Sequence, residues 1–272
     1  MKKNYSIAFG VTLMASMVLF SCKKDEVAPT VVKQWSIALS AKNENPAPVG
    51  RNETGTATVE LLSDNSLKYT IAITGLAAGD ALTASHLHVG NVITNSSVIL
   101  DLQPTFTGGN ASATITNLRS SLVDSLKNDV NEIYFNVHST QVASGIVRGQ
   151  LNVKLEMVAD VVLSGLNEVP AVTTTATGIA LIRVTANKQM FTRVTVNNLE
   201  ATDALTAAHI HRAAAGVNGA VMIGICSSAA DFGVVKTFTV DDATFASLKA
   251  DAIYVNAHSV NRPSGIVRGQ IR

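Results

Sequence analysis

The six histidines of the sequence all belong to two copies of one pattern, His-x-His followed by Asn-x-His-Ser. The first copy comprises His86, His88 and His138, and the second comprises His209, His211 and His258. Positions i and i+2 of a β-strand share a face and lie about 6.6–6.8 Å apart, so both histidines of His-x-His can approach one ion. If the strand bearing the third histidine lies alongside, each copy presents three imidazoles. Such a set suits copper, zinc or nickel and leaves a position open for water or another ligand.

The same side chains also fit a purely structural role. Histidine, asparagine, arginine and glutamine can form a polar network that holds a loop against a sheet. Arg148 and Arg268, which occur at matching places in the two copies, could then donate hydrogen bonds to carbonyl or carboxylate oxygens. The sequence leaves a metal site and a structural network open as alternatives.

A duplicated unit organises the chain. The segment Ser-Gly-Ile-Val-Arg-Gly-Gln occurs at 144–150 and again at 264–270, and the histidine patterns recur at a similar offset. A period of about 120 residues is far longer than a solenoid repeat and indicates duplicated domains. We therefore predict two domains, residues 35–155 and 160–272.

Within each unit, apolar and polar residues alternate, as they do over 67–74. Alternation of apolar and polar residues with period two, among many β-branched residues, indicates half-buried strands. Gly, Asn, Asp and Thr mark the turns between them. The pattern predicts an all-β fold of seven or eight strands per unit, arranged as an antiparallel sandwich or barrel. One short helix is expected in each unit, over 118–127 and 242–249.

Composition excludes several classes of function. Lys and Arg total 21 against 20 Asp and Glu, so the net charge is +1 and we expect no nucleic-acid partner. The chain lacks a Gly-rich phosphate loop, a His-Glu-x-x-His motif, a Cys-x-x-Cys pair and an EF-hand loop. Ser139 and Ser259 follow a histidine directly, but neighbouring strand residues face opposite ways, so neither has an adjacent base. No complete catalytic set remains, which favours a non-catalytic protein while leaving enzyme activity open.

The first 22 residues have the character of an export signal. Two lysines precede an apolar run of fourteen residues, which is shorter than the roughly 20 that a membrane span needs. The run ends in Leu-Phe-Ser-Cys, which resembles a bacterial lipobox with Cys22 as the lipidated residue. The alternative is a plain signal peptide in which Cys22 is an incidental thiol.

The linker that follows, residues 23–34, begins with Lys-Lys-Asp-Glu. This start resembles a signal for lipoprotein export to the cell surface, although it also fits a solvated charged tether. We expect a bacterial outer-membrane or cell-surface lipoprotein that is held to the membrane by the lipid on Cys22.

The repeated motifs resemble the CHRD domain, a family first described in chordin. The matching segments are Asn-Glu-x-Pro, Leu-Thr-Ala-x-His-x-His, Ile-Tyr-x-Asn-x-His-Ser and Ser-Gly-Ile-Val-Arg-Gly-Gln, each present in both units. The second unit continues after His211 with Arg-Ala-Ala-Ala-Gly-Val-Asn-Gly, similar to a loop of the family. The first unit is expected to lack most of this loop.

CHRD domains are in turn similar, at a distance, to copper–zinc superoxide dismutase, an immunoglobulin-like Greek-key β-barrel. The resemblance implies copper-type ligands at the three histidines of each unit and an anion-steering role for Arg148 and Arg268. It supports at most a mononuclear copper site or its relic. The sequence has no candidate for a histidine that bridges copper and zinc, no zinc loop and no stabilising disulfide.

Two functional hypotheses follow. The first is a surface lipoprotein whose two domains bind an unknown protein or glycan ligand without catalysis. The alternative is a protein that binds mononuclear copper or zinc, or uses copper for redox chemistry, through a His-x-His plus His site in each domain.

Overall fold

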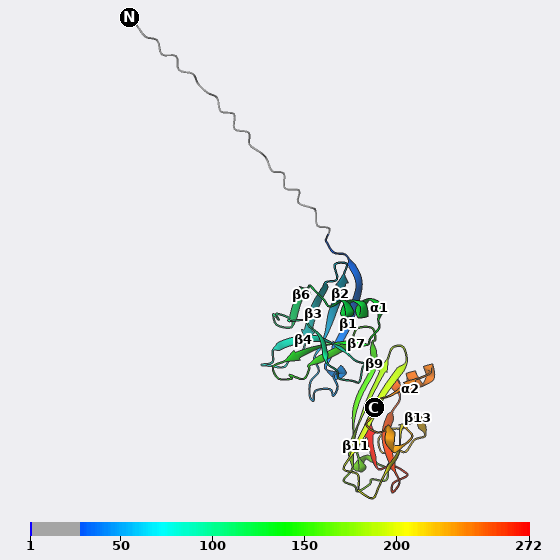
Figure 1. The fold of residues 1–272 in the computed structure, drawn as a ribbon. Coiled ribbons are helices and arrows are strands. Elements are labelled where there is room, and N and C mark those ends of the chain that lie inside the picture. The colour runs from blue at the N-terminus through cyan, green and yellow to red at the C-terminus, as the bar shows by residue number, and fades with distance from the viewer. Residues whose placement is uncertain (2–27) are drawn as a thin grey trace.

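The computed structural model describes Met1 and residues 28–272, so Cys22 and most of the predicted leader lie outside the described residues. Across residues 28–272 the chain forms two eight-stranded antiparallel sheets, arranged end to end (Figure 1). This confirms the predicted all-β class with two tandem antiparallel units. Among the residues described, neither α-helix has the length and apolar character that crossing a bilayer requires.

The first sheet has the strand order β5-β4-β7-β8-β1-β2-β3-β6. Its elements are β1 (Val31–Ser40), η1 (Ala41–Asn43), β2 (Thr54–Leu62), β3 (Leu67–Thr74), β4 (Leu82–Val89), β5 (Val98–Asp101), β6 (Asn110–Ile115), α1 (Ser120–Asn128), β7 (Ile133–Ser139) and β8 (Val147–Gln150).

The second sheet repeats this order as β13-β12-β15-β16-β9-β10-β11-β14. Its elements are β9 (Leu155–Ser164), η2 (Gly165–Asn167), β10 (Thr177–Thr185), β11 (Gln189–Asn197), β12 (Leu205–Arg212), β13 (Val221–Cys226), η3 (Ala229–Asp231), β14 (Lys236–Thr239), α2 (Asp242–Ala250), β15 (Ile253–Ser259) and β16 (Val267–Gln270).

Each domain contains the one short α-helix that the sequence predicts, directly before its last two strands. α1 begins two residues later and ends one residue later than expected, and α2 ends one residue later. The Asp241 side chain caps α2 by accepting a hydrogen bond from the Thr244 amide at 2.8 Å, which satisfies a free N–H of the first turn.

The strand order places the histidine-bearing strands side by side. β4, which carries His-x-His, pairs with β7, which carries the third histidine, and β7 pairs with β8. In this register His86 lies opposite Asn136, and Asn136 lies opposite Arg148. The second domain repeats the arrangement with β12, β15 and β16.

Alternating burial along the strands builds one apolar core in each domain. Leu87 is fully buried, and it separates two histidines whose rings lie on the other side of β4. The only tryptophan of the chain, Trp35, is 5% exposed and belongs to the first core. The core residues of the His-x-His strand therefore orient the face that carries the two histidines.

The second glycine of the repeated Ser-Gly-Ile-Val-Arg-Gly-Gln segment marks the point where β8 meets β1. A Cβ atom on Gly149 would lie 2.4 Å from the Ala38 carbonyl oxygen, and one on Gly269 would lie 2.4 Å from that of Val162. Only glycine permits this approach, which joins the two halves of each sheet at Arg148 and Arg268.

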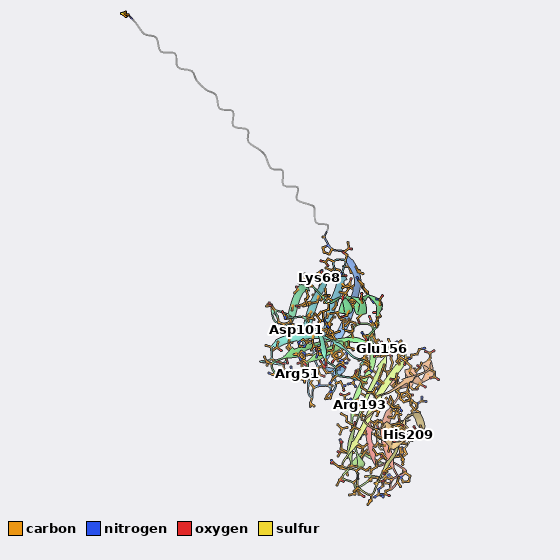
Figure 2. All side chains as sticks on the ribbon, in the orientation of Figure 1. Arg51, Lys68, Asp101, Glu156, Arg193 and His209 are labelled. Atoms are coloured by element: carbon orange, nitrogen blue, oxygen red, sulfur yellow. The ribbon has the colours of Figure 1, made fainter. Side chains whose placement is uncertain are left out.

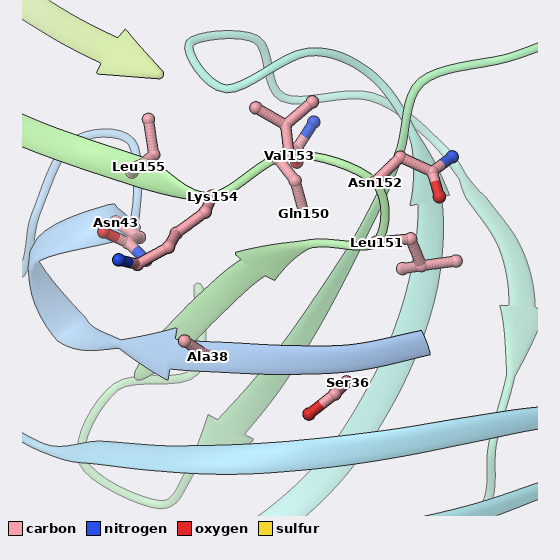
Figure 3. Close-up of a pocket in the computed structure, with 9 residues that line it drawn as sticks. All are labelled: Ser36, Ala38, Asn43, Gln150, Leu151, Asn152, Val153, Lys154 and Leu155. Carbon is pink, nitrogen blue, oxygen red and sulfur yellow. The ribbon is translucent and has the colours of Figure 1, made fainter. Parts of the chain in front are cut away.

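The domains are joined by a short segment. β9 begins at Leu155, so the stretch between β8 and β9 spans residues 151–154. This segment lines a cleft of about 320 Å³ together with Ser36 and Ala38 of β1 (Figure 3). None of the six histidines lines this cleft.

Replacing Leu87 with alanine should lower the free energy of unfolding of the first domain by about 2–5 kcal/mol, because it leaves a cavity beneath the His-x-His strand. Urea unfolding followed by the fluorescence of Trp35 measures this domain selectively. Val98→Ala, at a position that is 47% exposed on neighbouring β5, should change the value by no more than about 0.5 kcal/mol. Equal effects of the two substitutions would contradict the described packing of β4.

Candidate metal centres

The three histidines of the first domain converge. His86 and His88 lie on β4 and His138 lies on β7, and each offers one nitrogen such that the three atoms are within 4.8 Å of one another. The shortest contact, 2.9 Å, joins His86 Nδ1 to His138 Nε2. The structure thus brings together the complete triad that the sequence assigned to this domain.

Backbone carbonyls determine which ring nitrogens are free to bind a metal. His88 Nδ1 lies 2.7 Å from the Ser96 carbonyl oxygen, and His138 Nδ1 lies 2.9 Å from that of Ala143. A carbonyl oxygen only accepts, so both Nδ1 atoms carry a proton, and in the neutral rings the electron pair is on Nε2. His88 Nε2 also lies 3.1 Å from the Asn136 side chain. His86 Nδ1 must then donate to His138 Nε2. A metal ion held by both rings would replace that proton.

Burial favours the neutral form of four of the six rings. Desolvation, followed by repulsion from His138, lowers the pKa of His86 below its ordinary value, and desolvation is also the main cause of the lowered pKa of His88. The same two kinds of cause lower the pKa of His209, and desolvation lowers that of His258. Neutral imidazole is the form that coordinates a metal, so the sites favour the competent state at neutral pH.

The second domain has the same site. His209 Nδ1 and His258 Nε2 lie 3.0 Å apart, and the donor atoms of its triad again lie within 4.8 Å of one another. His211 Nδ1 faces the Gly219 carbonyl oxygen at 3.0 Å, while its Nε2 is buried without any hydrogen-bond partner. A buried imidazole nitrogen with a free electron pair is costly in apolar surroundings, and a bound metal would satisfy it.

The pattern of strands and side chains agrees with one family of proteins. The family model of the CHRD domain matches residues 35–151 and again residues 159–271. The chain belongs to the CHRD domain family. A search of curated proteins and a search of solved structures each returned no match.

In each CHRD domain, a tyrosine lies between one site histidine and a buried arginine. The ring of Tyr134 stacks on His88 with centroids 4.6 Å apart and planes 2° apart, and the Arg148 guanidinium carbon lies 3.5 Å from the ring centroid. Tyr254 repeats this, at 4.7 Å from His211 and 3.3 Å from Arg268. The stack fixes the plane of the histidine ring, while the cation–π contact stabilises the arginine. The residue pattern alone gave these tyrosines no role, although both occupy the repeated Ile-Tyr-x-Asn-x-His-Ser segment.

Arg148 and Arg268 hold the loop that follows the His-x-His strand. Arg148 donates to the carbonyl oxygens of Asn91 and Thr94 and to Asn95 Oδ1, at 2.5, 2.9 and 3.0 Å. Arg268 repeats the set with two loop carbonyls and a side-chain amide oxygen, and each arginine is only 1% exposed. Burial lowers the pKa of Arg148 to about 10. The guanidinium groups thus contact loop oxygens rather than bulk solvent.

The expectation that the first domain lacks most of this loop is wrong. In both domains the second histidine of His-x-His donates a hydrogen bond to a loop carbonyl eight residues further along the chain. The acceptor is Ser96 for His88 and Gly219 for His211. The loop of the first domain is as long as that of the second. The sequence misled because the two loops share little beyond the asparagine that each arginine contacts, Asn95 and Asn218, and are otherwise held through backbone oxygens, which do not require matching side chains.

A buried carboxyl group lies beside each site, from the Asn-Glu-x-Pro segment. Glu44 is 6% exposed, and its Oε1 has no hydrogen-bond partner. It lies so close to Gly145 that a Cβ there would be 2.6 Å from Oε1. Desolvation raises the pKa of Glu44 to about 7 despite the opposing charge of Arg148, and it also raises that of Glu168 to about 7.

A second pair of carboxylates fixes the loop after the third histidine. Asp80 accepts hydrogen bonds from the Ser139 and Thr140 hydroxyls, at 2.8 and 2.9 Å. Asp203 likewise accepts from the Ser259 hydroxyl at 2.6 Å. These aspartates were missed, although the segment Asp-Ala-Leu-Thr-Ala that begins at each of them is repeated letter for letter.

In the metal-free protein, Glu44→Gln should flatten the pH dependence of stability between about pH 5 and 7. A raised carboxyl pKa means that the folded state keeps a proton that the unfolded chain releases, so this group's contribution falls as pH rises. The variant should match the parent near pH 5 and exceed it at pH 8, by about 1–3 kcal/mol in the free energy of unfolding. Histidine titration is common to both proteins and cancels in the difference. Parallel pH profiles in urea unfolding, followed through Trp35, would contradict this assignment.

Proposed function

We propose that each CHRD domain binds one transition-metal ion, copper or alternatively zinc, through its three histidines. The observation that supports this most directly is the approach of three imidazole nitrogens to within 4.8 Å of one another in both domains. Three imidazoles without a carboxylate among them suit borderline metals better than calcium or magnesium, which prefer oxygen ligands.

The surrounding residues fit such an ion. The ligand atoms would be Nδ1 of His86 and Nε2 of His88 and His138, with the corresponding atoms in the second domain. The carbonyls of Ser96 and Ala143 hold the opposite nitrogens of the two Nε2 ligands, which fixes their tautomer and increases their basicity. Copper would supply one-electron redox chemistry, and zinc would supply a Lewis acid.

Ligand binding without catalysis is the second candidate function. A cavity of about 490 Å³ in the first domain is lined by His88 and His138, by Tyr134 and by the segment from Glu44 to Val49. Its volume lies within the range of about 300–1,000 Å³ that is typical of small-molecule sites. A protein or glycan group could enter here and reach the histidines.

For location, we propose lipid anchoring through Cys22 at the outer membrane or cell surface. Support comes from the lipobox-like Leu-Phe-Ser-Cys segment and the charged residues after it. β1 begins at Val31, nine residues after Cys22, so the first domain would lie within about 30 Å of the lipid. The second domain, farther along the chain and beyond the first in Figure 1, would extend away from the membrane.

Copper loading tests the metal proposal. The purified protein should retain two copper ions per chain after gel filtration, as measured by elemental analysis. His86→Ala/His88→Ala should retain one, and the further substitutions His209→Ala/His211→Ala should remove the other. Asp124→Ala, an exposed carboxylate on α1, is the control and should retain two. If the fourfold histidine variant takes up as much copper as the parent, the proposal fails.

Membrane anchoring is tested separately. Cys22→Ala should move the protein from the membrane fraction to the soluble fraction of lysed cells, because no diacylated cysteine would remain. Cys226→Ala is the matched control, since Cys226 is a buried core residue, and it should remain with the membranes. Continued membrane association of Cys22→Ala would show that another feature holds the protein there.

A further inference from the structure

The two domains are in contact, and the contact involves the loops that support the first metal site. In the first domain these are the Asn-Glu-x-Pro segment and the loop at 90–96. In the second domain the contact is made by the outer face of β9, β10 and β11. Leu181 and Phe191 pack there against Val92 and Ile93, and all four side chains are at most 8% exposed.

Polar bonds surround this apolar centre. Arg183, which is fully buried, pairs with Asp160 at 2.6 Å and donates to the Glu44 carbonyl oxygen at 3.0 Å. Asp160 also accepts from the Ala47 amide at 2.9 Å. Arg193, labelled in Figure 2, reaches Asn45 Oδ1 at 3.5 Å. The Asn-Glu-x-Pro segment of the first domain is therefore held by the second domain.

These contacts continue to the metal site. The Asn45 side chain contacts the Ile93 carbonyl oxygen, and Asn95 donates to the Asn45 carbonyl. The loop held in this way contains Ser96, whose carbonyl oxygen accepts a hydrogen bond from His88 Nδ1. A change at the domain contact is thus two hydrogen-bonded steps from a metal ligand.

The docking surface exists only on the second domain. β10 in the second domain and β2 in the first both begin with Thr-Gly, and each pairs with the strand that follows it in the same register. Arg183 therefore corresponds to Glu60. Phe191, which lies opposite Arg183, corresponds to Lys68, which lies opposite Glu60. Leu181 corresponds in the same way to Thr58. The first domain therefore has a polar face with a partly exposed ion pair of 2.9 Å between Lys68 and Glu60, and Figure 2 shows Lys68 at the end away from the second domain.

The docking loop exists only on the first domain. Counted from the histidine, Val92 and Ile93 correspond to Ala215 and Gly216 in the second domain, which are exposed. The docking loop therefore occurs only in the first domain and the docking surface only in the second, and the two are in contact. Successive copies of the chain cannot associate head to tail through this contact. The outer face of β2 and β3 in the first domain lacks the docking surface, and the loop at 213–219 in the second domain lacks the apolar docking residues.

We propose that the outer face of β10 and β11 is a dedicated docking surface for the first domain's site loops, so that the first metal site is braced and the second is not. The docking and bracing follow from the apolar and polar contacts between the two domains. Their consequence for metal release rests on the proposed function. The braced site should release copper more slowly, because a preorganised outer shell keeps the ligands in place.

Two variants test the docking from opposite sides. Val92→Ala/Ile93→Gly gives the first loop the residues that the second loop already uses, and Leu181→Asp/Phe191→Asp changes only the second domain. Both should raise the maximum dimension in small-angle X-ray scattering and speed hydrogen exchange of amides at 90–96, while amides at 213–219 stay unchanged. Val260→Asp, at a position 63% exposed just after β15 and away from β9, β10 and β11, is the control and should alter neither measurement.

Metal release is measured on single-site backgrounds with excess chelator. With the second site removed by His209→Ala/His211→Ala, the Leu181→Asp/Phe191→Asp change should speed copper release from the first site by about tenfold or more. With the first site removed by His86→Ala/His88→Ala, the same change should have no effect.

The inference would be overturned if scattering from the parent required two independently moving domains. It would also be overturned if the rate of hydrogen exchange at 90–96 were unchanged in both docking variants. Release from the first site that is insensitive to Leu181→Asp/Phe191→Asp would overturn its consequence for the metal. If neither site takes up copper, the proposed function fails, while scattering and hydrogen exchange still decide the docking.

Discussion

The architecture of each domain depends on one buried arginine. Arg148 lies where β8 meets both β1 and β7, and its own carbonyl oxygen accepts a hydrogen bond from the Asn43 side chain. Its guanidinium binds three oxygens of the loop after β4 and lies over the Tyr134 ring, which in turn stacks on His88. Removing a charge from water is costly, and this set of hydrogen bonds and the aromatic face offset that cost. The result is that strand, loop and site histidine share one support.

Duplication preserved this support and changed what surrounds it. His86 lies opposite Asp101, whose carboxylate is 3.7 Å from its Nε2, whereas His209 lies opposite Gly224. The two sites therefore have the same three histidines but different charge beside them. The domain contact adds a second difference, since only the first site has its loops covered by a neighbouring sheet.

Much of the site could be predicted because its residues obey simple periodicities. Spacing of two residues along a strand places His86 and His88 on one face, and the repeat singled out the third histidine of each domain. Two features were not readable in this way. The loop at 90–96 is held mainly through carbonyl oxygens, so the one side-chain trace of its equivalence to 213–219 is the asparagine at Asn95 and Asn218. Asp80 acts on a loop some sixty residues away, a pairing that only the fold creates.

The sequence by itself determined the β class, the duplication, the family and the two histidine triplets, because alternation and repetition are local properties of the chain. Only the tertiary structure decided that the triplets converge, which ring nitrogens face one another, and that the second domain supports the first. Convergence depends on the lateral order of the strands, and docking depends on which outer-facing residues meet a partner. Both are relations between distant segments, and no local pattern encodes them.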